Sequence, residues 1–289
     1  MRIAVALGAG GARGYAHIGA IQALEERGFD IVGVAGSSIG ALVGALYASG
    51  KLQAYAEWVC TIGQREVLRL LDPALGAPGA IRGEKVMAEV RELLDGVRIE
   101  ELSIPFAAVA TDLRAGRAVW FQRGPAEVAV RASIAVPLAI TPIMVDGRLL
   151  ADGGLMEPLP VAPTTFMPAD AVVAVSLPVK AGRTGSGEGA AAWASAGAGP
   201  AAQIVTGLVN DDGPLGELPA DLRALDVISL SIEAVRDQLI RYRLAGHPPD
   251  LLIQIPTSGV RMYDFHRATE MIEVGRRATL DALASNPFA

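Results

Sequence analysis

Short apolar runs alternate with amphipathic stretches along most of the chain. An apolar run bounded by turn residues predicts a buried strand, whereas apolar residues that recur about every three or four positions predict a helix. The predicted strands are Arg2–Leu7, Ile31–Ala35, Pro105–Thr111, Ala118–Phe121, Ala171–Leu177 and Asp250–Ile255. The predicted helices are Tyr15–Arg27, Ala41–Ser49, Glu84–Leu94, Val128–Ile134, Ser231–Leu244 and Phe265–Leu283. This alternation predicts an α/β fold with a mostly parallel sheet covered by helices on both faces.

Two turns are predicted by local sequence signals. Asp-Gly separates the apolar segments Ile143–Val145 and Arg148–Ala151, which is typical of a tight β-hairpin. Gly50 follows the second predicted helix directly, as a left-handed helix cap does.

The stretch 181–202 departs from the α/β pattern, because it consists almost entirely of Ala, Gly, Ser and Thr around one Trp193. That composition is typical of a mobile loop, either a plain linker or a lid over a crevice. The α/β order returns afterwards. We therefore expect an insertion within one domain over residues 1–289, followed by a C-terminal α/β extension over residues 226–285.

The composition is apolar, with 51% hydrophobic residues and a mean hydropathy of +0.37. No run reaches the roughly 18 apolar residues that a membrane-spanning helix needs, and the first residues lack the apolar length of a signal peptide. We therefore expect a cytoplasmic protein and leave open a peripheral contact with the inner face of the membrane.

Charge and metal-ligand residues narrow the functional classes. The net charge is −6 and no basic run is present, which argues against nucleic-acid binding. A lone Cys60 excludes an internal disulfide and a cysteine metal cluster. The three histidines, His17, His247 and His266, are far apart in sequence, so we expect neither a metal nor a coenzyme.

A glycine-rich loop follows the first predicted strand and contains Gly8, Gly10, Gly11 and Gly14. Its main-chain N–H groups suit either a dinucleotide phosphate or the oxyanion of a transition state. The spacing departs from G-x-G-x-x-G because Arg13 occupies the sixth place, and no acidic residue ends the second strand. We therefore favour an oxyanion hole, whose donors are expected at Gly10, Gly11, Ala12 and Arg13.

Ser38 is the candidate nucleophile, because Gly36 and Gly40 flank it in the pattern G-x-S-x-G between a predicted strand and a helix. This is the context of a nucleophile elbow, where the helix N-terminus favours developing negative charge. Ser37 lacks the flanking glycines and is the lesser candidate. A plain strand-to-helix turn of small residues is the alternative interpretation.

Asp152 is the candidate base, because it ends a predicted strand and is followed by Gly153 and Gly154. A free Asp, with a pKa of about 3.9, is a weak base, but burial in an apolar crevice raises that pKa. Asp112 is the second candidate, with capping of a turn as its alternative role. His17 is expected to pack on the first helix rather than act as a base.

Six segments carry a resemblance to a known family: GAGGARGYAHIGAI, GSSIGALVGALYASG, PFAAVATDL, VRASIAVP, DGRLLADGGLMEPLPV and PPDLLIQIPTSGVRMYDFHRA. The chain resembles the bacterial patatin-like phospholipases over nearly its whole length outside the insertion. The resemblance implies a three-layer α/β/α fold, a motif-bearing core over residues 3–166, and serine acyl hydrolysis through a Ser–Asp dyad. By the same resemblance, Ser38 is the nucleophile, Asp152 the base, and Gly10–Arg13 the oxyanion hole, with Arg13 helping to hold the loop.

Two residues depart from the family pattern. Ala9 stands where the family commonly has glycine, and its small methyl group is expected to be tolerated. Glu157 stands where the family usually has asparagine. Its carboxylate is expected either to raise the pKa of Asp152 or to face water.

Together these residues predict a hydrolase of acyl lipids that cleaves phospholipids, lysophospholipids or related carboxylic esters. The alternative from another class is a catalytically weak scaffold or regulator that binds acyl lipids.

Overall fold

The computed structural model describes residues 1–70, 79–81, 84–178 and 224–285. The predicted insertion 181–202 lies outside these residues. The sequence predictions for the remaining segments can be compared with the structure one by one.

The centre of the described structure is an eight-stranded sheet with the order β10-β9-β1-β2-β4-β8-β7, in which β5 also pairs with β4. Its strands are β1 Arg2–Leu7, β2 Asp30–Ser37, β4 Phe106–Asp112, β5 Arg117–Phe121, β7 Ile143–Val145, β8 Arg148–Asp152, β9 Ala171–Ser176 and β10 Leu251–Gln254. The five strands from β10 to β4 are parallel, whereas β5, β7 and β8 run antiparallel to their neighbours. A separate short pair joins β3 Gly79–Ile81 to β6 Leu138–Ile140.

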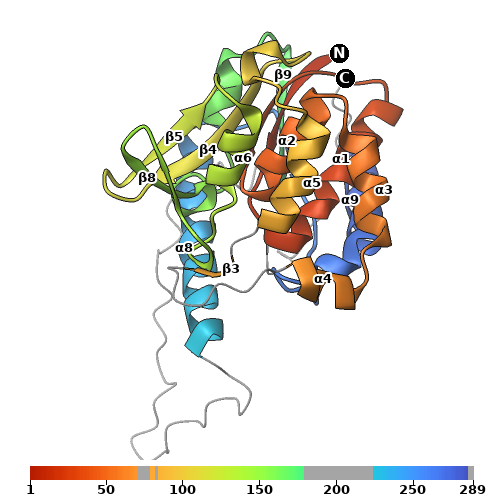
Figure 1. Cartoon of the computed structure of the whole chain (residues 1–289). Helices are drawn as coiled ribbons and strands as arrows, with labels where there is room; N and C mark the ends of the chain where they lie inside the picture. The colour runs from red at the N-terminus through yellow and green to blue at the C-terminus, as the bar shows by residue number, and fades with distance from the viewer. Residues whose placement is uncertain (71–78, 82–83, 179–223, 286–289) are drawn as a thin grey trace, which may run out of the picture.

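Helices cover both faces of this sheet, which gives the predicted three-layer α/β/α arrangement (Figure 1). They are α1 Ala16–Glu26, α2 Ile39–Ala48, α3 Leu52–Thr61, α4 Gln64–Leu70, α5 Glu84–Leu94, α6 Ala126–Ser133, α8 Ala224–Gly246 and α9 Ala268–Ser285. In Figure 1, α8 lies apart from the group formed by α1, α2, α3, α5 and α9. The α/β class predicted from the alternation of strands and helices is therefore confirmed.

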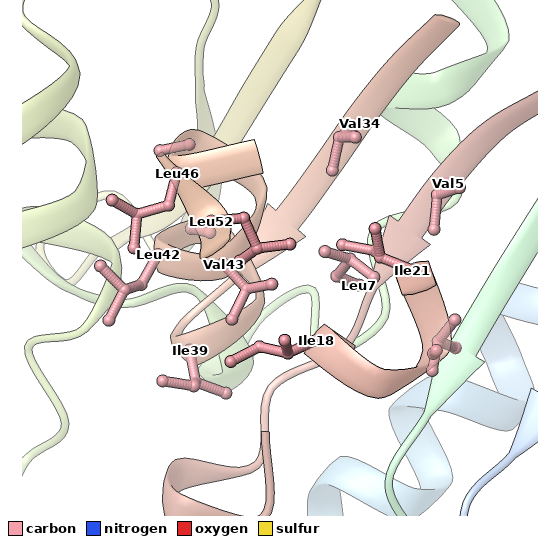
Figure 2. Packing of buried hydrophobic residues seen from close by; sticks show 14 of the residues in the cluster. Val5, Leu7, Ile18, Ile21, Val34, Ile39, Leu42, Val43, Leu46 and Leu52 are labelled. Atoms are coloured by element: carbon pink, nitrogen blue, oxygen red, sulfur yellow. The ribbon is translucent and has the colours of Figure 1, made fainter. Parts of the chain in front are cut away.

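Alternate side chains of β1 point to opposite faces of the sheet and pack in two different hydrophobic clusters. Ile3, Val5 and Leu7 pack with apolar side chains of α1 and α2 in the larger cluster, part of which is shown in Figure 2. Ala6, on the other face, packs in a smaller cluster with residues that include Leu244 of α8. The side chains of β1 thus pack on both faces of the sheet, and α8 contributes to the smaller of the two clusters.

The first and last helices of the described fold pack against each other closely. A Cβ atom on Gly19 of α1 would overlap the main-chain carbonyl of Ile272, and a Cβ on Gly275 of α9 would overlap that of Ala16. Glycine at both positions is therefore a packing requirement, because main chain cannot move aside as a flexible side chain can.

The predicted turns have the expected backbone. Asp146 and Gly147 both have positive φ, 48° and 75°, as the tight hairpin between β7 and β8 requires, and Gly50 caps α2 with φ 72°. Two boundaries differ from the prediction in a way that matters for the site. β2 extends to Ser37, and α2 begins directly afterwards at Ile39.

Candidate active site

Ser38 is the single residue between β2 and α2, and its backbone is strained. Its φ is 58° and its ψ is −126°, a combination that L-residues rarely adopt and that costs about 1–3 kcal/mol. Ser37, the lesser candidate, is the last residue of β2, and its buried hydroxyl has no hydrogen-bond partner among the described residues. The sharp turn therefore presents Ser38 at the N-terminus of α2.

The glycines around Ser38 are explained by main-chain crowding. A Cβ on Gly36 would overlap the carbonyl of Gly40, and a Cβ on Gly40 would overlap the carbonyl of Leu7 at the end of β1. The elbow thus brings the main chains of β1, β2 and α2 together at distances that exclude any side chain at these two positions.

Asp152 reaches Ser38 because β2 and β8 share one edge of β4. Ser37 pairs with Val109 of β4, and Asp152 pairs with Ala110, the next residue of the same strand. β5 occupies the opposite edge over the same part of β4. Since β2 runs parallel to β4 and β8 runs antiparallel, their carboxyl ends meet head to head.

Ser38 Oγ donates a hydrogen bond to Asp152 Oδ2, and Asp152 Oδ1 accepts another from the N–H of Gly154 at 2.7 Å. Ser38 and Asp152 are 4% and 6% exposed. Burial raises the pKa of Asp152, while the Ser38 hydroxyl, the positive charge of Arg236 and the Gly154 N–H act in the opposite direction. The carboxylate is thus a stronger base than a free Asp and still has partners for its charged form.

Ser133, which the sequence analysis did not single out, supports the elbow from α6. Its Oγ accepts a hydrogen bond from the N–H of Ser38 at 2.8 Å and donates one to the carbonyl of Val109 at 2.5 Å. Thr111 Oγ1 likewise donates to the carbonyl of Asp152 at 2.9 Å. Both halves of the Ser38–Asp152 pair are therefore fixed to β4 by side-chain hydroxyls. The segment VRASIAVP contains Ser133, but nothing in its spacing indicated this role.

The glycine loop is held by hydrogen bonds on both sides of Gly10 and Gly11. The Ala9 N–H donates to the carbonyl of Pro158 at 2.8 Å, and the Ala12 N–H donates to that of Met262 at 2.7 Å. Among the described residues, the N–H groups of Gly10 and Gly11 form no hydrogen bond. The candidate oxyanion donors are therefore Gly10 and Gly11, and the expectation that Ala12 is a donor was wrong because its N–H is already engaged.

Arg13 lies inside a short 3-10 helix, η1 Gly11–Tyr15, with its side chain 3% exposed. Its Nη2 pairs with Glu233 Oε1 of α8 at 2.5 Å. The guanidinium thus ties the loop to α8. This contact agrees with the expected role of Arg13 in holding the loop, whereas the donor role of its main-chain N–H stays a prediction.

The other motif glycines also stand at close contacts. A Cβ on Gly14 would overlap the side chain of Ile39, and one on Gly153 would overlap the carbonyl of Val109. A Cβ on Gly154 would lie 2.8 Å from both the Ala9 methyl group and Asp152 Oδ1. Ala9 is buried, and its methyl group fits because Gly154, which lies opposite, has no side chain.

His17 is fully buried and contacts the glycine loop rather than Ser38. Its Nε2 lies 2.7 Å from the carbonyl of Gly8, and burial lowers its pKa to about 4. The ring is therefore neutral near pH 7, with Nε2–H as the donor to Gly8. His247 and His266 are exposed.

The second acidic candidate has the alternative role. Asp112 Oδ1 accepts hydrogen bonds from the N–H groups of Arg114 and Ala115, both at 3.0 Å, and so caps the turn after β4. It makes no contact with Ser38 in the described hydrogen-bond network.

One of the two expectations was that Glu157 faces water, and the structure contradicts it. It is 1% exposed, its Oε2 accepts a hydrogen bond from Trp120 Nε1 at 2.7 Å, and its Oε1 lies 3.8 Å from Arg243 Nη1. Burial raises its own pKa, opposed by the Trp120 hydrogen bond and by the charges of Arg243 and His247. Its neighbours are thus different from those of Asp152.

Helix α8 brings three charged residues over this region that no motif had indicated. Besides Glu233, Arg236 Nη2 donates to the carbonyl of Ala9 at 2.5 Å, and Arg243 Nη2 donates to that of Met156 at 3.1 Å. The structure therefore adds α8 to the motifs as a fourth part of the site, beside the loop, the elbow and the Asp152 turn.

A sequence profile described as patatin-like phospholipase matches residues 5–165, which hold the loop, the elbow and the Asp152 turn. The chain belongs to the patatin-like phospholipase family. At the level of the family, this membership supports a lipid hydrolase.

Relatives with known sequences agree with this family. An uncharacterised NTE family protein of Mycobacterium tuberculosis is 44% identical over 336 aligned positions, covering 98% of this chain and 91% of the relative. A lysophospholipase NTE1 of Mycosarcoma maydis is 36% identical over 61% of this chain, which corresponds to 10% of that protein. The human patatin-like phospholipase domain-containing protein 6 is 32% identical over 61% of this chain and 13% of its own length.

The fold has a solved counterpart as well. VipD from Legionella pneumophila superposes with a TM-score of 0.59 at 15% identity, covering 98% of this chain and 66% of that protein. At this identity the similarity concerns the patatin-like fold alone.

The described residues also bear on metals and membranes. They contain no cluster of three or more His, Cys, Asp or Glu side chains arranged to hold a metal ion. None of the described helices has the length and hydropathy needed to cross a bilayer.

Proposed function

We propose that this patatin-like protein is a lipid acyl hydrolase in which Ser38 attacks the ester carbonyl carbon and Asp152 accepts the serine proton. The observation that carries the proposal is the buried hydrogen bond from Ser38 Oγ to Asp152 Oδ2 at a strained elbow. Strain at a functional group persists only when the surrounding structure enforces it, which here the glycines and Ser133 do.

The reaction divides into two balanced steps. In the first step, Ser38 Oγ forms a bond to the ester carbonyl carbon and Asp152 takes the serine proton. The N–H groups of Gly10 and Gly11 stabilise the oxyanion of the tetrahedral intermediate. Collapse of this intermediate expels the alcohol, which takes the proton from Asp152, and leaves an acyl-enzyme. In the second step, a water molecule gives its proton to Asp152 and attacks the acyl carbon, and Ser38 leaves with that proton while the fatty acid is released.

The substrates that we propose are phospholipids, lysophospholipids or related acyl esters. Support comes from the family profile, which matches the residues of the site, and from the similarity to a lysophospholipase NTE1 and to a patatin-like phospholipase domain-containing protein. Neither a metal nor a coenzyme has a role in this mechanism.

The decisive test is covalent labelling of Ser38 by a fluorophosphonate probe, which reacts only with an activated serine. The wild-type chain should be labelled and should hydrolyse a p-nitrophenyl ester, whereas Ser38→Ala should do neither. Ser37→Ala is the matched control and should still be labelled at Ser38. A folded wild-type protein that binds acyl lipid without being labelled would instead favour the scaffold or regulator.

We also propose a peripheral contact with a lipid bilayer through the outer face of α8. Val235 and Tyr242 on this face are 59% and 81% exposed, and with Leu239 they border an open apolar groove of about 550 Å³. Glu233 and Arg236 of the same helix contact the glycine loop. A bilayer held against the exposed part of α8 would thus lie close to the site.

Vesicle co-sedimentation tests this contact. The wild type should sediment with phosphatidylcholine vesicles, and the variant with Val235→Ser and Tyr242→Ser should bind several-fold less, because burial of apolar area drives such binding. Met144→Ser removes an equally exposed apolar residue on β7 and should bind like the wild type. Equal binding by all three proteins would contradict the contact.

A further inference from the structure

Arg236 of α8 lies between the glycine loop and the carboxylate of Asp152. Its Nη2 donates to the carbonyl of Ala9 at 2.5 Å. Its Nε is buried and has no hydrogen-bond partner among the described residues. Nε lies 3.6 Å from the point where a Cβ on Gly154 would stand, and Asp152 Oδ1 lies 2.8 Å from that same point. The guanidinium and the carboxylate therefore both border the space that the absent side chain of Gly154 leaves.

The contact with Ala9 fixes a peptide plane that matters for the reaction. The described chain contains no cis peptide bonds, so the carbonyl of Ala9 and the N–H of Gly10 point in opposite directions across one rigid plane. Pulling the carbonyl toward Arg236 therefore sets the direction of the Gly10 N–H. The preceding plane has its own anchors, since His17 holds the carbonyl of Gly8 and the carbonyl of Pro158 holds the N–H of Ala9.

The charge of Arg236 acts on the other partner. Burial lowers the pKa of Arg236, and the charge of Asp152 raises it; Arg13, Glu233 and Asp237 are the other charged groups around it. Glu233 is already paired with Arg13. Asp152 is therefore the carboxylate of the site that interacts with the buried guanidinium of Arg236. In return, the positive charge lowers the pKa of Asp152 against the effect of burial.

We propose that Arg236 is a positioning residue for acyl transfer, which aims the Gly10 N–H at the oxyanion and keeps Asp152 in its ionised form. This inference rests on the proposed function. It assigns to α8, outside the segment matched by the family profile, a direct effect on both the oxyanion hole and the base.

The experiment compares Arg236→Met, Arg236→Lys and the control Arg241→Met, which changes an exposed arginine of the same helix. For a soluble p-nitrophenyl ester, kcat and KM are measured separately from pH 4 to 9, with circular dichroism to verify folding. Arg236→Met should lower kcat by about 10–100-fold with little change in KM, because a misdirected donor acts on the transition state. Loss of the cation raises the pKa of Asp152, so the acidic side of the pH profile should move to higher pH.

Arg236→Lys separates the two effects, because it keeps the charge without the planar fork of donors. Its pH profile should stay close to that of the wild type while kcat remains reduced. If Arg236→Met fails to fold, Arg236→Lys carries the test alone. A wild-type kcat in Arg236→Lys would then overturn the positioning role.

Other results would also overturn the inference. One is a wild-type kcat and pH profile in Arg236→Met, and another is an equal loss of kcat in Arg241→Met. The third is a reduced kcat with an unmoved pH profile in Arg236→Met, which would indicate a structural role only. Fluorophosphonate labelling of the wild type distinguishes this failure from failure of the proposed function. If the wild type is labelled, the function stands whatever the Arg236 variants do.

Discussion

The elbow at Ser38 and the helix α8 both contact the glycine loop, but they are built differently. At the elbow, main-chain atoms approach so closely that glycine is required at Gly36 and Gly40. At α8, long charged side chains bridge the distance to the loop. Crowded main chain leaves a recognisable spacing in the sequence, whereas a contact through flexible side chains leaves none. The first kind of contact should also respond to mutation in an all-or-none way, and the second in a graded way.

The largest effect is expected on the elbow side, from Asp152→Asn. An amide cannot accept the proton of Ser38, so kcat for a p-nitrophenyl ester should fall by about 10²–10⁴-fold, the usual contribution of a general base. Asp112→Asn is the matched control, because Asn can still cap the turn after β4, and it should keep wild-type kcat. Wild-type turnover by Asp152→Asn would remove the base from the mechanism.

Gly36→Ala should come next. The added Cβ meets the main-chain carbonyl of Gly40, which has no rotamer to change, so the free energy of unfolding should fall by about 3 kcal/mol. Urea unfolding measures this. The control Gly63→Ala has no atom within 4 Å of the new Cβ and should change stability by less than about 1 kcal/mol. Similar losses in both variants would mean that crowding does not set the requirement for glycine.

His17→Gln tests the loop through pH. In the folded protein the pKa of His17 is lowered to about 4 from an ordinary 6.5, so the unfolded chain takes up a proton that the folded chain does not. The stabilisation by the neutral ring is complete above pH 6.5 and is lost as the pH falls from 6.5 toward 4, by about 3 kcal/mol in total. Unfolding free energies measured across this range should therefore decline less steeply in His17→Gln, which lacks the titrating group. Parallel pH curves for the two proteins would contradict the assignment.

The smallest effect is expected on the α8 side, from Glu233→Gln. The change leaves Arg13 with a neutral partner at a site that is partly open to solvent, so stability should fall by about 1 kcal/mol and kcat by a few-fold. Glu273→Gln, in an exposed helical pair with Arg277, should have no measurable effect on urea unfolding. A loss as large as that of Gly36→Ala would erase the distinction between the two kinds of contact.

The sequence was sufficient for the elements whose pattern is purely local. The strands of the parallel sheet, the β7–β8 hairpin and the Gly50 cap all follow from apolar period and turn residues within a few positions. The helix α3 was missed although Leu52, Tyr55, Ala56 and Val59 have helical spacing, because its Trp58 and Cys60 fall off that stripe. The short strands β3 and β6 have three residues each, too few for any periodicity to be recognised.

For the site, the residues with special backbone needs were predicted and the supporting side chains were not. Ser38, Asp152 and the motif glycines stand at positions where only small residues or a tight turn fit. Ser133 and Arg236 are a common serine and a common arginine on helices, and only the pairing of β2, β4 and β8 and the placement of α8 give them their partners. The donor assignment of Ala12 failed for a related reason, because Met262 comes from a distant part of the chain.

The close packing of α1 against α9 has a consequence for synthesis of the protein. During translation, α1 is made long before α9, and its apolar surface carries a glycine notch that α9 fits. Until the ribosome has delivered α9, that part of the α1 surface stays uncovered. The compact packing of α1 should therefore form only after α9 has been made.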